Sequence, residues 1–120
     1  MRILISGNRR GLGAALTQSF SQHGHQVWGF SPASPPPNQV DVSNFEQVQA
    51  WVESVVQHYG PPDLVIANAA TVLAPTPLAQ VDPGDFSRLI DVNVKGMFYF
   101  FRAVLPHMSS GVLIGISSGY

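Results

Sequence analysis

The stretch RILISGNRRGLG, residues 2–13, decides the fold of this chain. It opens with Ile3, Leu4 and Ile5, a short apolar run typical of a fully buried strand. A glycine-rich turn follows, and the pattern of a helix begins at Leu12. Glycines let such a turn bend tightly and let a phosphate approach backbone N–H groups. Because the N-terminus of a helix attracts anions, the stretch predicts a loop that binds nucleotide phosphates.

The glycines of this loop, Gly7, Gly11 and Gly13, have the spacing G-x-x-x-G-x-G. A glycine-rich turn alone is weak evidence, since many tight turns use glycine only for their geometry. Here the turn lies between a strand and a helix, as dinucleotide binding requires. No Gly-Lys-Ser or Gly-Lys-Thr follows, so the loop is not a P-loop. We therefore favour a dinucleotide-binding loop over a purely structural turn.

The composition is that of one globular domain. The chain has 120 residues, of which 45% are hydrophobic and 11% charged, with a formal net charge of −1. This balance gives no electrostatic reason to expect nucleic acid or an anionic membrane as a partner. Cysteine is absent, which fits the cytosol, and no apolar run is long enough to span a bilayer. We therefore expect a cytoplasmic protein. His23 and His25 have no third ligand nearby in the sequence, so we expect no metal site.

Strand and helix patterns alternate along the chain. Further strands are expected at residues 26–30, 39–40, 63–67 and 111–116, with helices at 43–59 and 83–107 and a proline-rich surface loop at 31–38. This alternation predicts an α/β fold, a Rossmann-like doubly wound parallel sheet with helices on both faces. Such sheets bind ligands at the carboxyl ends of their strands, where the strand order reverses. Gly7 and Asn68 each follow a strand, so we expect both to line one crevice.

Two helices have informative ends or faces. Ser43 and Glu46 have the spacing of a capping box and are expected to start the first of them. The helix at 83–107 begins with Pro83 after Asp82 and is apolar on more than one face. A helix of this kind is buried on two sides, so we expect it to join copies of the chain in a homo-oligomer.

Five landmarks occur in the order typical of the short-chain dehydrogenase/reductase family, and together they cover the whole chain. Residues 6–13 resemble the family's TGxxxGxG loop, and Asp41 with Val42 resembles its acidic residue after the third strand. Residues 68–70 resemble its NAG segment, with alanine in place of the usual glycine. Residues 91–96 resemble its mid-helix asparagine motif, and residues 116–118 resemble the strand end that supplies its active-site serine. The chain is therefore similar to this family.

The resemblance implies a cofactor site. The glycines would hold the pyrophosphate side of a dinucleotide, Asp41 would meet the adenine with Val42 beside it, and Asn68 would lie near the adenosine ribose. The full set of implied cofactor-binding residues is Gly7, Asn8, Arg9, Arg10, Gly11, Leu12, Gly13, Ser31, Asp41, Val42, Asn68, Ala69 and Ala70. Asp41 fits a capping or turn role equally well, and Asn68 fits a turn at a strand end.

The resemblance also implies two catalytic residues. Ser118 would hydrogen-bond the carbonyl oxygen of the substrate, where charge develops during hydride transfer. Asn93 would belong to the active-site group, by organising a water that connects to a lysine. Ser117 fits the role of the active serine as well, and only the register favours Ser118. Asn93 also fits a polar residue whose hydrogen bonds are satisfied inside the core.

The choice of cofactor can be argued from charge. Sites specific for NAD usually place an acidic residue about 20 residues beyond the glycine loop, but no acidic residue occurs at positions 14–40. Ser31 can donate to a 2′-phosphate, and Arg9 and Arg10 can supply positive charge. Arg10, just before the second glycine, resembles NADP-preferring members of the family. The alternative is that the arginines merely solvate an exposed loop. We favour NADP(H) over NAD(H).

The Tyr-x-x-x-Lys pair of the family has no match. Tyr120 comes two residues after Ser118, and Tyr59 and Tyr99 lie on expected helices at unrelated positions. In the family the tyrosine is the general acid, and the lysine lowers its pKa. We therefore expect residues 1–120 to form a single dinucleotide-binding domain that is incomplete, truncated after the fifth strand and inactive alone.

The prediction is an NADP(H)-dependent oxidoreductase that transfers hydride between nicotinamide and a small-molecule carbonyl or alcohol. This chain would be its cofactor-binding half. One alternative is a non-catalytic NADP(H)-binding module, a redox sensor or scaffold. A third is a purely structural or interaction protein, which would use the apolar helix at 83–107 as its contact surface.

Overall fold

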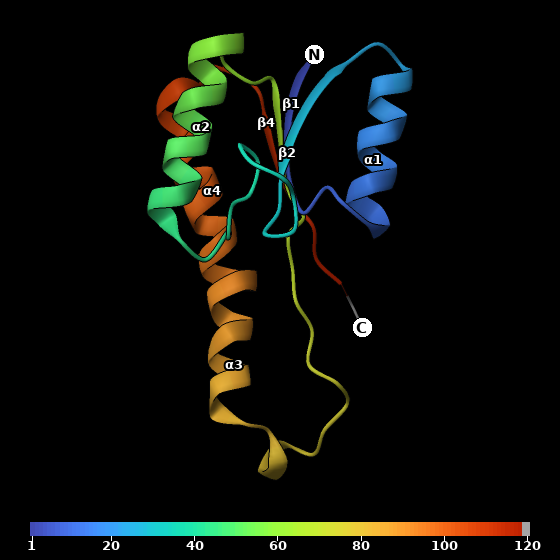
Figure 1. Cartoon of the computed structure of the whole chain (residues 1–120), viewed down its shortest axis with the longest axis vertical. Coiled ribbons are helices and arrows are strands. Elements are labelled where there is room, and N and C mark those ends of the chain that lie inside the picture. Colours follow the sequence, from blue (N-terminus) through green and yellow to red (C-terminus); the bar gives the residue numbers. More distant parts are fainter. Residues whose placement is uncertain (119–120) are drawn as a thin grey trace.

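A computed structural model describes residues 1–118. Its centre is a parallel sheet with the strand order β2-β1-β3-β4 (Figure 1). The strands are β1 (Arg2–Ser6), β2 (Gln26–Phe30), β3 (Leu64–Ala67) and β4 (Val112–Gly115). Helix α1 (Gly11–Gln22) covers one face of the sheet, and α2 (Phe45–Tyr59) and α4 (Gly96–Val104) cover the other. The predicted Rossmann-like, doubly wound parallel sheet is confirmed.

The register of the strands aligns their carboxyl ends. Ser6, the last residue of β1, lies opposite Phe30 of β2 and Ala67 of β3, and Ala67 lies opposite Gly115 of β4. The chain leaves β1 toward α1 on one face, whereas the helices connected to β3 lie on the other face (Figure 1). The strand order therefore reverses between β1 and β3, and the crevice for a ligand lies there.

Two apolar cores hold the helices to the sheet. In the larger one, Phe30 is fully buried, with its ring centroid 4.8 Å from that of Trp51 and 5.1 Å from that of Phe100. The smaller core joins α1 to the sheet and consists of Ile3, Ile5, Leu64 and Ile66, with Leu16, Phe20 and Val27 packed against them. The two cores hold the sheet between α1 on one face and α2 with α4 on the other, so the carboxyl ends of the strands keep a fixed position.

The prediction of a strand at residues 39–40 is wrong. Gln39 makes only an isolated bridge to Ser31, in which Ser31 N donates to Asn38 O and Val40 N donates to Ser31 O. The prolines at 35–37 lack N–H donors and cannot extend the ladder toward the start of β2. The described sheet therefore has four strands instead of the five predicted.

The capping box predicted from Ser43 and Glu46 is also wrong. Helix α2 begins at Phe45, and the side chain of Asn44 accepts a hydrogen bond from Gln47 N at 3.1 Å. The hydroxyl of Ser43 donates instead to Asp41 Oδ1 at 2.7 Å. Because the side chain of Ser43 is bound to Asp41, Asn44 is the residue that caps the helix.

The helical run predicted at 83–107 is confirmed, with a π-helical turn inside it. It consists of α3 (Pro83–Ile90), the π turn η2 (Asp91–Lys95), α4 and the 3-10 turn η3 (Leu105–His107). Within the single chain, α3 has no buried residue and the side of α4 with Phe98 is exposed, so burial of the run on a second side stays a prediction about a partner chain. Phe86 and Phe98 are 53% and 60% exposed. No helix among the described residues is both long and apolar enough to cross a membrane.

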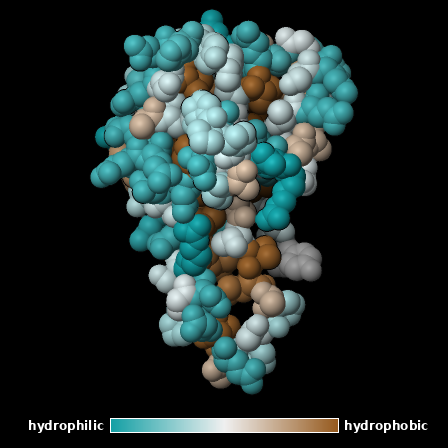
Figure 2. Space-filling view, viewed as in Figure 1, coloured by the Kyte–Doolittle hydropathy of each residue, from teal (hydrophilic) through white to brown (hydrophobic). Residues whose placement is uncertain are grey.

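Residues 72–90, which we call the arm, project from the body of the molecule. The arm comprises the loop after β3, the 3-10 turn η1 (Leu78–Gln80) and α3, and it forms the lower part of Figure 1. Apolar side chains reach its surface in the same view (Figure 2). Val72 and Leu78 are 85% and 90% exposed.

We predict that Gly13→Ala destabilises the protein by about 3 kcal/mol, because a Cβ at Gly13 would lie 1.9 Å from the backbone oxygen of Gly7. Chemical denaturation monitored by circular dichroism measures this change. Ser19→Ala, on the exposed side of the same helix, is the control and should change stability by less than about 0.5 kcal/mol. Equal stability of the two variants would contradict the close packing of α1 on β1.

Candidate functional site

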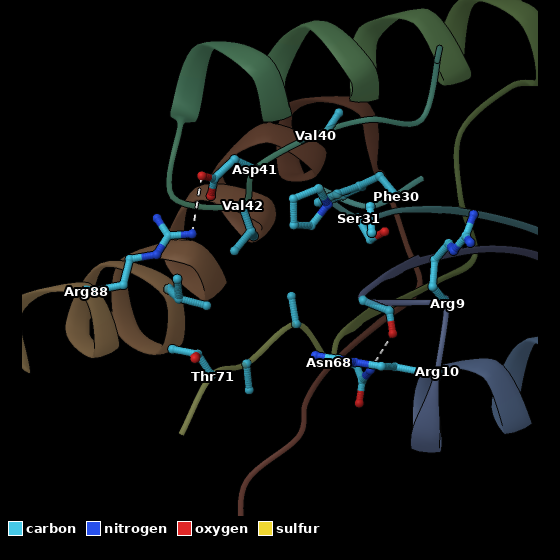
Figure 3. A pocket seen from close by; sticks show the side chains of 16 residues that line it. Arg9, Arg10, Phe30, Ser31, Val40, Asp41, Val42, Asn68, Thr71 and Arg88 are labelled. Carbon is cyan, nitrogen blue, oxygen red and sulfur yellow. Dashed lines mark hydrogen bonds and ion pairs between the residues drawn. The ribbon is translucent and has the colours of Figure 1, made fainter. Parts of the chain in front are cut away.

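A cleft of about 670 Å³ opens at the carboxyl edge of the sheet (Figure 3). Gly7 after β1 and Asn68 after β3 both line it, so the predicted crevice is confirmed. The arginines of the glycine loop lie at one end, and Asp41 with Arg88 of α3 lies at the other (Figure 3). The full lining is Gly7, Arg9, Arg10, Phe30, Ser31, Pro32, Ala33, Val40, Asp41, Val42, Asn68, Ala69, Ala70, Thr71, Arg88 and Val92.

Two glycines of the loop have backbone angles that favour glycine, and of these Gly7 lines the cleft. Gly7 and Gly11 have φ angles of +70° and +59°, in the region that favours glycine. A Cβ at Gly7 would lie 2.9 Å from Ala69 Cα, whereas a Cβ at Gly11 would meet no atom of the chain within 4 Å. The first glycine is therefore required by packing, and the space beside the second is open to a ligand.

The N-terminus of α1 is open to an anion. No side chain caps it, and its first turn carries no acidic residue. By contrast, Asn44 caps α2 and Asp82 caps α3, and both of those helices have an acidic residue in the first turn. Arg9 and Arg10, just before α1, are exposed and line the cleft. Uncapped N–H groups, the helix dipole and two guanidinium groups together fit the phosphates of a dinucleotide.

Ser6 binds the loop after β3 to the end of β1. Its hydroxyl oxygen accepts hydrogen bonds from Asn68 N and Ala69 N, both at 3.0 Å, and the residue is 1% exposed. The side chain of Asn68 donates to Gly7 O at 2.9 Å (Figure 3). These bonds fix the two loops of the cleft relative to each other. Ser6 itself was not predicted as a site residue, since its partners lie more than 60 positions away.

Ser31 directly follows β2, and it is the residue predicted to donate a hydrogen bond to a 2′-phosphate. It is 7% exposed, lines the cleft and shares a hydrogen bond of 2.8 Å with the hydroxyl of Ser34. Either hydroxyl can act as donor in this pair. Ser31 can therefore turn its hydrogen toward a ligand while it accepts one from Ser34.

Asp41 is held by two partners. Its Oδ1 accepts hydrogen bonds from Ser43 N at 2.9 Å and Ser43 Oγ at 2.7 Å, and its Oδ2 pairs with Arg88 Nη2 at 3.3 Å. Partial burial raises the pKa of Asp41, but the hydrogen bonds from Ser43 and the charge of Arg88 outweigh this effect and lower it below its usual value. The carboxylate therefore stays ionised at neutral pH.

The part of the cleft beside Asp41 has apolar walls, and we call this part the slot. Val40, Val42 and Val92 line it, and all three are buried. Gly96 lies behind Val42, where a Cβ would come within 2.7 Å of Val42 Cγ1. A planar apolar ring fits such a slot, because the slot has buried aliphatic walls and one charged rim.

Asn93 lies in the π turn η2 and holds the loop after β3. Its Oδ1 accepts from Thr71 N and its Nδ2 donates to Thr71 O, both at 2.8 Å. Both polar atoms of the side chain are thus used within the chain. π turns inside α-helices are frequent at functional sites, which agrees with the position of Thr71 in the cleft lining.

Ser117 and Ser118 follow β4 at the same edge of the sheet. Ile116 N donates to Ala67 O at 3.1 Å, which continues the pairing of β3 and β4 to the last residue before the serines. Both serines are exposed, and they lie outside the cleft lining. Tyr120, whose position does not match the tyrosine of the family, lies outside the described residues.

The cleft brings together most of the predicted cofactor residues, and some lie outside its lining. Those outside are Asn8, Gly11, Leu12 and Gly13, together with the predicted catalytic residues Asn93 and Ser118. The side chain of Asn8 fills the space above Gly29 on β2, and its Oδ1 is buried without a hydrogen-bond partner in the described chain. Thr71, Arg88 and Val92 line the cleft and were not predicted. In residues 1–118 no group of three or more His, Asp or Glu side chains is placed to hold a metal ion.

These features define an α/β protein with a Rossmann-like parallel sheet and a cleft at the carboxyl edge of that sheet. A family model described as short chain dehydrogenase matches residues 1–120. The chain therefore belongs to the short-chain dehydrogenase family, as the resemblance of its motifs predicted.

Individual relatives give the extent of the match. The NADPH-dependent pterin aldehyde reductase of Arabidopsis thaliana is 29% identical over 136 residues, covering 98% of this chain and 56% of the relative. The NADP-dependent 3-hydroxy acid dehydrogenase YdfG of Escherichia coli K12 is 28% identical over 134 residues, covering 98% and 54%. The chain spans about half the length of the curated relatives it matches.

Solved structures agree with the fold. Serine dehydrogenase from Escherichia coli matches with a TM-score of 0.89 and 28% identity, over 98% of this chain and 62% of that one. ElxO with NADP bound matches with a TM-score of 0.87 and 25% identity, over 99% of this chain and 58% of that one.

We predict that Asn93→Ala loosens the loop after β3, because it leaves the N–H and C=O of Thr71 without their partners. The expected loss of stability is about 1–2 kcal/mol, together with faster hydrogen exchange at the Thr71 amide. Asn93→Asp is the matched variant, because it keeps the acceptor for Thr71 N and replaces the donor to Thr71 O by a carboxylate oxygen. Unchanged exchange in Asn93→Ala would contradict this role.

The lowered pKa of Asp41 predicts a stability that depends on pH. The carboxylate stabilises the fold fully above its ordinary pKa, and this contribution is lost as the pH falls through the lower pKa of the folded state. At neutral pH the free energy of unfolding of the wild type should therefore exceed that of Asp41→Asn, and this difference should disappear below about pH 4. Unfolding measured from pH 3 to 7 tests this, with Glu53→Gln on α2 as a control for the loss of a surface carboxylate. A difference that grows on acidification would contradict the account.

Proposed function

We propose that this chain is the cofactor-binding part of an NADP(H)-dependent oxidoreductase that transfers hydride between nicotinamide and a small-molecule carbonyl or alcohol. The observation that carries the proposal is the glycine loop, which brings an uncapped helix N-terminus and two arginines to one cleft. Membership of the short-chain dehydrogenase family supports oxidoreductase chemistry. The names of two relatives and the NADP held by a similar structure support the choice of cofactor.

The residues of the cleft fit NADP(H) from end to end. The pyrophosphate would lie over the N-terminus of α1, beside the open space at Gly11. Arg9 and Arg10 would pair with the 2′-phosphate, and Ser31 would donate a hydrogen bond to it. The adenine would lie in the apolar slot beside Asp41. Bound NADP(H) supplies or accepts the hydride.

Two residues would serve the substrate. Ser118 would donate a hydrogen bond to the carbonyl oxygen, where negative charge develops during reduction. Its place after β4, at the edge where the cleft opens, supports this role, and Ser117 remains the alternative. Asn93 would fix the active-site loop through Thr71.

We also infer that the protein is cytoplasmic and that the helical run at 83–107 joins copies of the chain. The apolar side chains exposed along this run support such a contact, among them Phe86, Val94 and Phe98. All three are more than half exposed in the single chain.

The proposal predicts that the purified protein binds NADPH at least about 10-fold more tightly than NADH, because only NADPH carries a 2′-phosphate that can pair with the arginines. Arg10→Gln should weaken NADPH binding by about 10-fold and leave NADH unchanged. Fluorescence titration of the reduced cofactors measures both affinities. Arg102→Gln, on the exposed surface of α4, is the matched control.

The outcomes separate the alternatives. Because residues 1–120 are expected to be inactive alone, turnover is assayed with the protein isolated from its native source. NADPH oxidation by that protein with a panel of aldehydes and ketones supports the oxidoreductase, whereas tight NADPH binding without turnover supports a non-catalytic NADP(H)-binding module instead. Absence of binding to either dinucleotide would overturn the proposal.

A further inference from the structure

Arg88 connects the arm to the body across the end of the cleft. Its Nη1 donates to Ser43 Oγ at 2.8 Å, and its Nη2 donates to Asp41 Oδ2 at 3.3 Å. Ser43 in turn donates its hydroxyl and its N–H to Asp41 Oδ1. The three residues form a closed ring of hydrogen bonds, which spans 47 positions of the chain.

Apart from its continuity with η2, α3 makes few side-chain contacts that hold it to the body. No residue of α3 is buried. In the described chain, Arg88 is the residue of α3 whose side chain hydrogen-bonds to the body, and the next fixed point is Asn93 in the π turn. α3 continues directly into η2 and α4, and the ring around Arg88 adds a second attachment of α3 to the body, beside the cleft.

The ring lies where a bound base would meet the protein. Asp41 and Arg88 both line the cleft, and Val42 and Val92 line the slot between them. In Figure 3 the guanidinium group reaches from α3 toward the carboxylate, opposite the arginines of the glycine loop. A base in the slot would thus have the loop after β3 on one side and the ring at its edge.

The strength of the ion pair between Arg88 and Asp41 depends on how much water surrounds it. The side chains of Arg88 and Asp41 are 51% and 35% exposed, so water weakens their attraction in the free protein. A ligand that fills the slot removes this water and strengthens the bonds of the ring. Arg88 also neutralises Asp41, which would otherwise place an unpaired negative charge beside a ligand that carries several.

We propose that Arg88 is a positioning residue for the base of the dinucleotide, because it holds Asp41 in place and brings the arm over the adenine end of the cleft. This inference rests on the proposed function. It adds that cofactor binding and the position of α3 are coupled, so that the bound nucleotide orders the arm and the ordered arm tightens binding.

The test uses the purified protein with adenosine 2′,5′-bisphosphate, which carries the adenine end of NADP without the nicotinamide. Arg88→Met should weaken its binding by about 5-fold or more, and NADPH binding by the same factor. Arg88→Lys keeps the charge without the planar fork and should lose less. Ser43→Ala should weaken binding in the wild-type background and add little to Arg88→Met, since both act through one ring. Arg102→Met, on exposed α4, should bind like wild type.

A second readout separates positioning from a merely structural role. In the wild type, the bisphosphate should slow hydrogen exchange at residues 86–90, and in Arg88→Met it should not. If Arg88→Met binds as tightly as wild type, or if its arm gains the same protection, the positioning role is overturned while the proposed function stands. If wild type binds neither the bisphosphate nor NADPH, both fall. Should Arg88→Met fail to fold, Arg88→Lys and Ser43→Ala give the same comparison.

Discussion

The carbonyl oxygen of Gly7 is the point on which the site depends. Asn68 of the loop after β3 donates to it at 2.9 Å, and α1 packs against it so closely that Gly13 has no room for a Cβ. Ser6, one residue earlier, accepts two N–H groups from the same loop. One short stretch thus sets the distances between β1, α1 and β3, and the shape of the cleft at the glycine loop follows from those distances.

The cleft has two ends of different electrostatic character. At the glycine loop, Arg9 and Arg10 add positive charge to an uncapped helix N-terminus. At the other end the charge of Asp41 is balanced by Arg88, and the walls between are apolar. A ligand that carries phosphates at one end of an apolar ring system matches this arrangement.

Much of the fold could be predicted because its signals are local. The apolar run before Gly7 and the glycine spacing set β1, the turn and α1 without reference to distant residues. The strand at 39–40 could not be judged locally, because the prolines before it deny it a partner along β2. Asn44 caps α2 in place of the predicted Ser43, because the hydroxyl of Ser43 hydrogen-bonds to Asp41. Arg88 gave no signal, since its partners lie more than 40 positions away and only tertiary packing brings them together.

The most direct test of the central claim is an amide NMR spectrum of the protein titrated with NADPH. The account predicts that the largest shifts occur at Gly7, Gly11 and Asn68, with further shifts near Asp41. The molecule has a second hollow beside α2, whose lining includes Trp28, Trp51 and Tyr59, and it serves as an internal control. Shifts confined to that hollow, or no shifts at the glycine loop, would contradict the account.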